Sequence, residues 1–303
     1  MDHRDILRGL DAEQRAYLTE KSDGKGLTRL AAHWAPMFLI GGAIAAQVPF
    51  WQVLVLPQGI LIIFCFTLLH ETSHRTVFRT LWLNKAVAWV CGFLIILPPD
   101  WFRQFHADHH RFTQDPDRDP ELQAPKPDSA AAYLVHLSGV PVWKSQITTL
   151  FRNALGRVDY PYVAEKNRSR VVREARLMLA LYAGGAGLSA ALGSPVLVYA
   201  WILPVLLGQP FLRLYLLAEH AGCPQVSNML LNTRTTFTNP VVRWLAWNMP
   251  YHIEHHSFPA VPFHRLPEFH AILRDHLGVT ENGYVRFHAN YVRALGKSSA
   301  TAA

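Results

Sequence analysis

Eight of the sixteen histidines in this chain of 303 residues fall into three short clusters. The clusters have the spacings HxxxH, HxxHH and HxxHH, and their members are His70 and His74, then His106, His109 and His110, then His252, His255 and His256. Residues three or four positions apart share one face of a helix, so each cluster holds its imidazoles side by side. Neutral imidazole is the commonest metal-binding side chain. Since one zinc ion takes three or four protein ligands, eight imidazoles indicate two metal ions.

The ligand type does not choose the metal, because imidazole binds iron, zinc, copper and nickel. His70–His74 also matches HExxH, in which two histidines hold zinc and the glutamate is the base of a metalloprotease. An intramembrane zinc protease would leave the other two clusters unexplained. A metal transporter would bind its cargo near the middle of the bilayer, whereas these clusters lie at helix ends and in polar segments. Both readings remain remote alternatives.

The composition indicates a membrane protein. Hydrophobic residues make up 50% of the chain and charged residues only 17%, against about 25% charged residues in a typical soluble domain. The net charge of +7 suits anionic lipid headgroups. The aromatic residues lie mostly in apolar runs instead of alternating with basic residues, which argues against a nucleic-acid partner. The three cysteines have no CxxC spacing and indicate no disulfide framework.

Two long stretches without basic residues are each long enough for two membrane crossings of about 20 residues. The first follows Leu30 and the second covers Leu177–Leu212. They predict four transmembrane helices at about 31–48, 51–74, 177–193 and 195–220. A shorter apolar segment at 86–99 suits a re-entrant or interfacial helix, ended by Pro98 and Pro99, because a single crossing there would separate the first two histidine clusters.

The predicted fold is therefore an all-α integral membrane protein with two helical hairpins, an interfacial helix and a helical cap that carries the metal site. Its parts are an N-terminal arm at 1–29, a membrane domain at 30–280 and a tail at 281–303. Both hairpin turns lack Lys and Arg, so the positive-inside rule places both termini, the cap and the metal site on the cytoplasmic side.

The order of the three clusters resembles that of the membrane fatty acid desaturase superfamily, as does the run from Asn248 to Pro259 (NMPYHIEHHSFP). The resemblance implies a four-helix membrane bundle with a cytoplasmic cap and a non-haem di-iron centre. It also implies O2 as co-substrate and the introduction of a double bond into fatty acyl or related lipid chains. A hydroxylase or other monooxygenase of the same superfamily, acting on a lipid, isoprenoid or hydrocarbon, is the alternative.

The resemblance further implies a ninth ligand, His220, after the fourth membrane helix. The acyl-CoA desaturases of the superfamily have, one turn before this histidine, an asparagine that holds a water molecule, and this chain has Leu216 instead. No cytochrome b5-like segment is seen, so we expect a separate electron donor of the ferredoxin, rubredoxin or cytochrome b5 type.

Polar residues inside the motifs are candidates for hydrogen bonds to the metal-binding imidazoles, and these are Glu71, Asp108, Asn248 and Glu254. Three further acids could support the second cluster or form a solvated loop, namely Asp115, Asp117 and Asp119. The remaining histidines are expected to be surface or hydrogen-bonded residues, and these are His3, His33, His136, His264, His270, His276 and His288.

Overall fold

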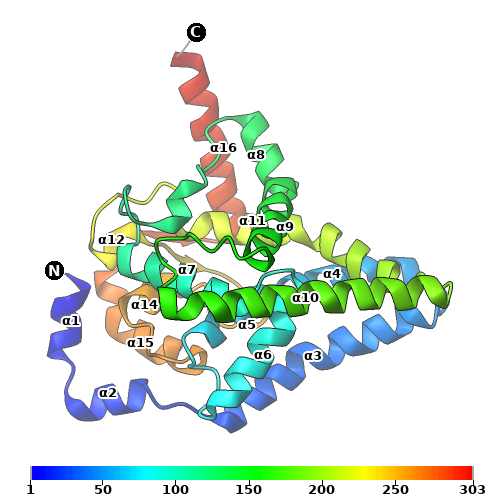
Figure 1. Ribbon diagram of the computed structural model, residues 1–303. Helices are drawn as coiled ribbons and strands as arrows, with labels where there is room; N and C mark the ends of the chain where they lie inside the picture. The colour runs from blue at the N-terminus through cyan, green and yellow to red at the C-terminus, as the bar shows by residue number, and fades with distance from the viewer. Residues whose placement is uncertain (1, 302–303) are drawn as a thin grey trace.

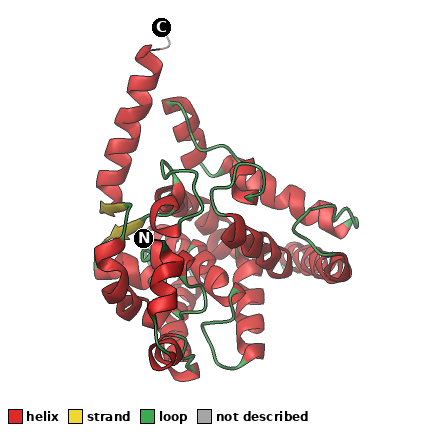
Figure 2. Ribbon diagram, turned by 90° about the vertical axis from the view of Figure 1, so that its left-hand side faces the viewer, coloured by secondary structure: helices red, strands yellow, loops and turns green. Residues whose placement is uncertain are grey.

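The computed structural model describes residues 2–301, which are mostly helical (Figure 1). The α-helices are α1 (His3–Gly9), α2 (Ala12–Leu18), α3 (Asp23–Ala45), α4 (Val55–Ile63), α5 (Cys65–Ser73), α6 (Leu81–Leu94), α7 (Pro99–Phe112), α8 (Ala130–Leu137), α9 (Val140–Ala154), α10 (Glu165–Ala191), α11 (Leu203–His220), α12 (Met229–Asn232), α13 (Pro240–Leu245), α14 (His252–Ser257), α15 (Leu266–Leu273) and α16 (Tyr284–Thr301). The short helices are η1 (Trp51–Leu54), η2 (Pro120–Gln123), η3 (Val198–Ile202), η4 (Phe263–Arg265) and η5 (Arg274–His276). A two-stranded parallel sheet pairs β1 (Thr235–Phe237) with β2 (Thr280–Asn282), as Figure 2 shows.

Two antiparallel helical hairpins give the molecule its long axis. The first consists of α3 followed by η1, α4 and α5, and the second consists of α10 followed by η3 and α11. Both turns lie at the right-hand end of Figure 1, whereas α7 and α14 lie towards the opposite end. Helices α5, α7 and α14 carry the histidine clusters. Helix α5 of the first hairpin and α11 of the second return from the turns to this polar end.

Two helical segments are long and apolar enough to cross a membrane, Trp51–Ser73 and Val198–His220. A third results if α6 and α7 are counted together, but the two are bent by 100° to each other. The sequence predicted four crossings, and the other two predicted helices, α3 and α10, both extend beyond the apolar stretches. Helix α3 begins at Asp23 because the Ser22 side chain accepts a hydrogen bond from the Lys25 amide.

The structure has two helices where the sequence predicted one interfacial segment at 86–99, and their bounds differ from the predicted ones. Helix α6 ends at Leu94, and Pro99 does not end it but is the first residue of α7. Proline favours this first position because the amide it lacks would have no partner within the helix. The end of α6 is held by two aromatic donors instead: Tyr182 donates to the Phe93 carbonyl and Trp201 donates to the Leu94 carbonyl, both at 2.8 Å.

Helices α4 and α11 cross with their backbones in contact. A methyl group added at Gly59 would lie 2.0 Å from the Pro204 carbonyl oxygen, and one added at Gly208 would lie 2.3 Å from the Gly59 carbonyl oxygen. Small residues permit this approach, which is a common way of packing helices within membranes. The crossing fixes the position of α11 relative to the hairpin that leads to the first histidine cluster.

We therefore expect Gly208→Ala to lower the melting temperature of the detergent-purified protein, because the new methyl group forces the two backbones apart, at a cost of about 1–3 kcal/mol or more. Gly42→Ala in α3 is the matched control, since nothing lies within 4 Å of its added methyl group. Alanine should leave the control as stable as the wild type or more stable, by up to about 1 kcal/mol. Equal melting temperatures for the two variants would contradict the close crossing.

Candidate metal centre

The nine candidate histidines come from the ends of four helices. His70 lies in the last turn of α5 and His74 directly follows it, while His220 is the last residue of α11. The second and third clusters lie on α7 and α14. Seven of the nine side chains are buried, and His74 and His110 are partly exposed. Side chains at helix ends reach one point from different directions, so the arrangement encloses a common space.

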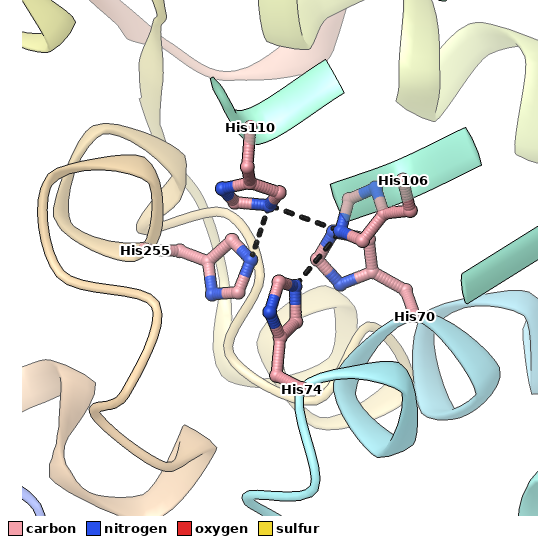
Figure 3. Close-up of side chains that lie close together, drawn as sticks. All are labelled: His70, His74, His106, His110 and His255. Atoms are coloured by element: carbon pink, nitrogen blue, oxygen red, sulfur yellow. Dashed lines mark hydrogen bonds between the residues drawn. The ribbon is translucent and has the colours of Figure 1, made fainter. Parts of the chain in front are cut away.

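Five of these imidazoles form a first group, consisting of His70, His74, His106, His110 and His255. Each offers one nitrogen atom, and these atoms all lie within 4.8 Å of one another. Figure 3 shows the five rings converging from separate segments. The His106 Nε2 atom lies 2.8 Å from Nε2 of His74 and 2.9 Å from Nε2 of His110. The His110 and His255 Nε2 atoms are 3.2 Å apart.

The other four imidazoles form a second group. His109, His220 and His256 offer nitrogen atoms within 4.8 Å of one another. The His220 Nε2 atom lies 3.2 Å from Nε2 of His109 and 3.1 Å from Nε2 of His252. His220, which the resemblance singled out as a ninth ligand, therefore lies inside the second group.

The hydrogen bonds behind the second group determine which nitrogen atoms face inward. The Nδ1 atom of His109 is 2.9 Å from an Asp119 oxygen, and Nδ1 of His220 is 3.4 Å from the Asn232 carbonyl oxygen. Nδ1 of His256 is 3.1 Å from the Thr113 hydroxyl, which donates its own proton to the His109 carbonyl. In these three rings Nδ1 thus faces an acceptor and carries a proton, which leaves Nε2 to face the centre of the group.

These nitrogen atoms fit metal ions. Two ligands at about 2.1 Å from one ion and at right angles to each other are about 3 Å apart, which matches the separations above. Both ring nitrogens of His70 and Nε2 of His256 are buried without a hydrogen-bond partner among the described residues. Burial holds the pKa values of His255 and His256 well below the ordinary value. Neutral imidazoles with converging lone pairs repel one another, and a shared cation removes that repulsion.

Carboxylates lie behind several of the imidazoles, as is usual for metal-binding histidines. Besides the Asp119 contact, Nδ1 of His252 is 3.5 Å from a Glu219 oxygen, and Nδ1 of His255 is 4.0 Å from Oε2 of Glu71. The other Glu71 oxygen accepts hydrogen bonds from the Thr76 hydroxyl and the Phe263 amide. Glu71 is thus held among its own partners behind His255, which disfavours its use as the base of a zinc protease.

The predicted polar partners divide into two kinds. Glu71 faces His255, and Glu254 accepts from the Thr235 hydroxyl at 2.5 Å and bonds to His270. Asp108 and Asn248 make no hydrogen bond to a candidate metal-binding imidazole among residues 2–301, and Asn248 donates instead to the Phe263 carbonyl at 2.9 Å.

The sequence left the role of Asp119 open, and it missed His270 as the partner of Glu254. The sequence feature that could have indicated Asp119 is its position before Pro120. There its side chain caps η2 by accepting a hydrogen bond from the Glu121 amide. His33 behaves as expected of a hydrogen-bonded histidine, since it contacts the Leu61 carbonyl at 2.9 Å and accepts from Trp247.

One cavity adjoins this region, and an apolar one extends to the turn of the second hairpin. A cavity of about 450 Å³ is lined by Gln114, Lys126 and His220, among others, and so lies beside the second group. An apolar cavity of about 900 Å³ lies between α9, α10 and the η3–α11 segment, and its lining includes Trp143, Tyr182 and Trp201.

Asp119→Asn should weaken metal binding by roughly 10–100-fold, because the amide no longer supports the Nδ1 proton of His109 by charge. The measurement is the iron retained against a competing chelator. Asp117→Asn, an exposed acid of the same loop, is the control and should retain iron like the wild type. Equal retention by both variants would show that Asp119 does not support the site.

Comparison with known protein families gives a match to the fatty acid desaturase family over residues 27–288. The chain is 26% identical over 218 residues to a sphingolipid delta(4)-desaturase of Candida albicans, covering 68% of this chain and 57% of that protein. It is 26% identical over 215 residues to a sphingolipid delta(4)-desaturase of Drosophila melanogaster, covering 68% of this chain and 60% of that one. An sn-1 oleoyl-lipid 12-desaturase of Picosynechococcus is 21% identical over 240 residues, covering 70% of this chain and 66% of that protein.

The matched part of the chain thus spans about three fifths of the length of the two sphingolipid desaturases. The family match takes in all three histidine clusters and His220, and it confirms the resemblance seen in the sequence. This family combines membrane helices with oxidoreductase chemistry on lipids. The chain belongs to the fatty acid desaturase family.

Proposed function

We propose that the protein is a non-haem di-iron membrane enzyme that uses O2 to introduce a double bond into fatty acyl or related lipid chains. The observation that carries the proposal is the convergence of nine imidazoles into groups of five and four at the polar end of the hairpins. When bound, two irons would supply activation of O2 and oxidation of an unreactive C–H bond. The family match favours lipid desaturation over the protease and transporter readings.

The chain's own residues hold and orient the metals. The five imidazoles of the first group would ligate one iron, and His109, His220, His252 and His256 would ligate the other. Asp119, 2.9 Å from Nδ1 of His109, would keep the proton of that ring on its outer side, so that Nε2 stays directed inward. Burial lowers the pKa values of His106, His252, His255 and His256, so these imidazoles are unprotonated and free to bind a metal ion. Burial also lowers the pKa of His109, but the neighbouring Glu121 and Asp119 carboxylates raise it by more, so a metal ion bound there would displace a proton.

The substrate class follows from the family and from the membrane helices. The relatives named above act on sphingolipids and on an oleoyl lipid, so we propose a long-chain lipid that reaches the irons from the bilayer. Reduction of O2 to water takes four electrons, and the two C–H bonds of the substrate supply two of them. The other two would come from a separate ferredoxin, rubredoxin or cytochrome b5-type donor on the polar side.

We also propose four membrane crossings, with the irons and both termini on the cytoplasmic side. Single cysteines placed at Gln47 or Ser194, in the two hairpin turns, should react with an impermeant thiol reagent added outside cells. Cysteines at Asp115 or Glu281 should react only after the membrane is opened. The native cysteines Cys65, Cys91 and Cys223 are all buried and should give little background. External labelling at Asp115 would contradict this topology.

Iron content and lipid products test the proposed chemistry together. Wild-type protein supplied with iron should hold about two irons per chain, and cells expressing it should accumulate lipids with an additional double bond. His109→Ala should lose much of the iron and lower product formation roughly a hundredfold or more, since a ligand contributes at least as much as its hydrogen-bonding partner. His276→Ala removes an exposed histidine of η5 that belongs to neither group and should behave like the wild type.

A new hydroxyl group in place of a double bond would identify the hydroxylase alternative. Zinc bound through His70 and His74 alone, without iron after iron supply, would contradict the di-iron proposal.

A further inference from the structure

The two groups of imidazoles differ in number, and an acid lies next to the smaller one. The first group has five imidazoles and the second has four. The Oε2 atom of Glu121, in η2, is 3.4 Å from Nε2 of His109. That separation is close to the 3.2 Å and 3.1 Å that separate the nitrogen atoms of the second group from one another. Glu121 Oε2 thus lies at ligand spacing from His109, although it is outside the set of atoms that lie within 4.8 Å of one another in this group.

The contact between Glu121 and His109 places a carboxylate beside the inward-facing nitrogen of the ring. Asp119 accepts hydrogen bonds from the Gln114 amide at 2.8 Å and the Glu121 amide at 2.9 Å, and its Oδ1 atom is 2.9 Å from Nδ1 of His109. Without a metal ion the Glu121 contact is an ion pair with protonated His109, because burial lowers the pKa of His109 but the neighbouring Glu121 and Asp119 carboxylates raise it by more. A metal ion that replaces the Nε2 proton would face both Nε2 of His109 and Oε2 of Glu121.

Lys126 holds the carboxylate in this orientation. Its ammonium group pairs with Oε1 of Glu121, the oxygen that points away from His109. The backbone also helps to place Glu121, because its amide donates a hydrogen bond to Asp119, the residue that contacts Nδ1 of His109. The carboxylate and the imidazole are thus positioned by the same acid, and only Oε2 remains to face the second group.

Resting on the di-iron function proposed above, we propose that Glu121 is an oxygen ligand of the second iron and that Lys126 positions it. The second iron then has four nitrogen ligands and one oxygen ligand, whereas the first has five nitrogen ligands. Leu216, one turn before His220 on α11, provides no donor atom, so the fifth ligand is supplied from η2.

Mössbauer spectroscopy on protein loaded with 57Fe tests this assignment, because it reports each iron separately. The wild type should show two doublets of equal area. In Glu121→Gln one doublet should shift while the other stays unchanged. A chelator should remove the iron of the shifted doublet at least roughly tenfold faster than from the wild type. Glu165→Gln, an exposed glutamate at the start of α10, is the matched control and should give the wild-type spectrum.

Two further variants separate ligation from a merely structural role. Lys126→Gln breaks the same ion pair but leaves the carboxylate, so it should keep both irons; loss of iron equal to that of Glu121→Gln would overturn the proposal. Glu121→His offers a nitrogen at the same place, where the Glu121 side chain is 32% exposed and leaves room. It should keep two irons with one altered doublet, and it decides the matter if the glutamine variant does not fold.

The outcomes also distinguish the two proposals. A wild type that holds two irons, with unchanged spectra in both Glu121 variants, overturns this assignment alone. A wild type that takes up no second metal overturns the di-iron function and this assignment together.

Discussion

Imidazoles that direct lone pairs towards one point repel one another unless a proton or a metal ion lies between them. Nine imidazoles direct nitrogen atoms towards two points here, so the partners on the outer side of each ring decide which nitrogen atom faces inward. In the second group Asp119, the Asn232 carbonyl and Thr113 each bind an Nδ1 atom and so keep the Nε2 atom inward. The surroundings of the rings are therefore built for metal ions.

Holding the two groups together requires helices from both hairpins to end at the same depth. The first group depends on α5, which continues directly from α4, and the second depends on the last residue of α11. Contact between the backbones at Gly59 and Gly208 sets the axial position of α11 against α4, because neither helix can slide without a clash. A packing feature within the apolar segment thus determines whether His220 and His70 can contribute to neighbouring metal sites.

Much of this could be predicted from the sequence because imidazole clusters and long apolar runs are local signals. The three clusters and His220 come together in space, and the two apolar helical segments Trp51–Ser73 and Val198–His220 lead to His74 and His220. The prediction was wrong where tertiary contacts decide: Pro99 begins α7, since Tyr182 and Trp201 already hold the end of α6. Asp108 lies within its motif and points elsewhere, whereas Asp119, ten residues beyond His109, turns back through the η2 cap. A loop that brings a residue back to an earlier helix in this way leaves no periodic pattern in the sequence.

Charge balance explains why acids surround a ligand set that has no charge of its own. Two ferrous ions bound as proposed would bring four positive charges into the site, and neutral imidazoles would offset none of them. Four carboxylates approach the groups directly, those of Glu71, Asp119, Glu121 and Glu219. Asp119 contacts Nδ1 of His109 at hydrogen-bonding distance, whereas Glu71 and Glu219 approach Nδ1 atoms without a hydrogen bond. Glu121 differs because its carboxylate approaches an Nε2 atom and pairs with Lys126, which lines the cavity beside the second group. The first group also reaches the polar side of the protein, because His74 and His110 are partly exposed.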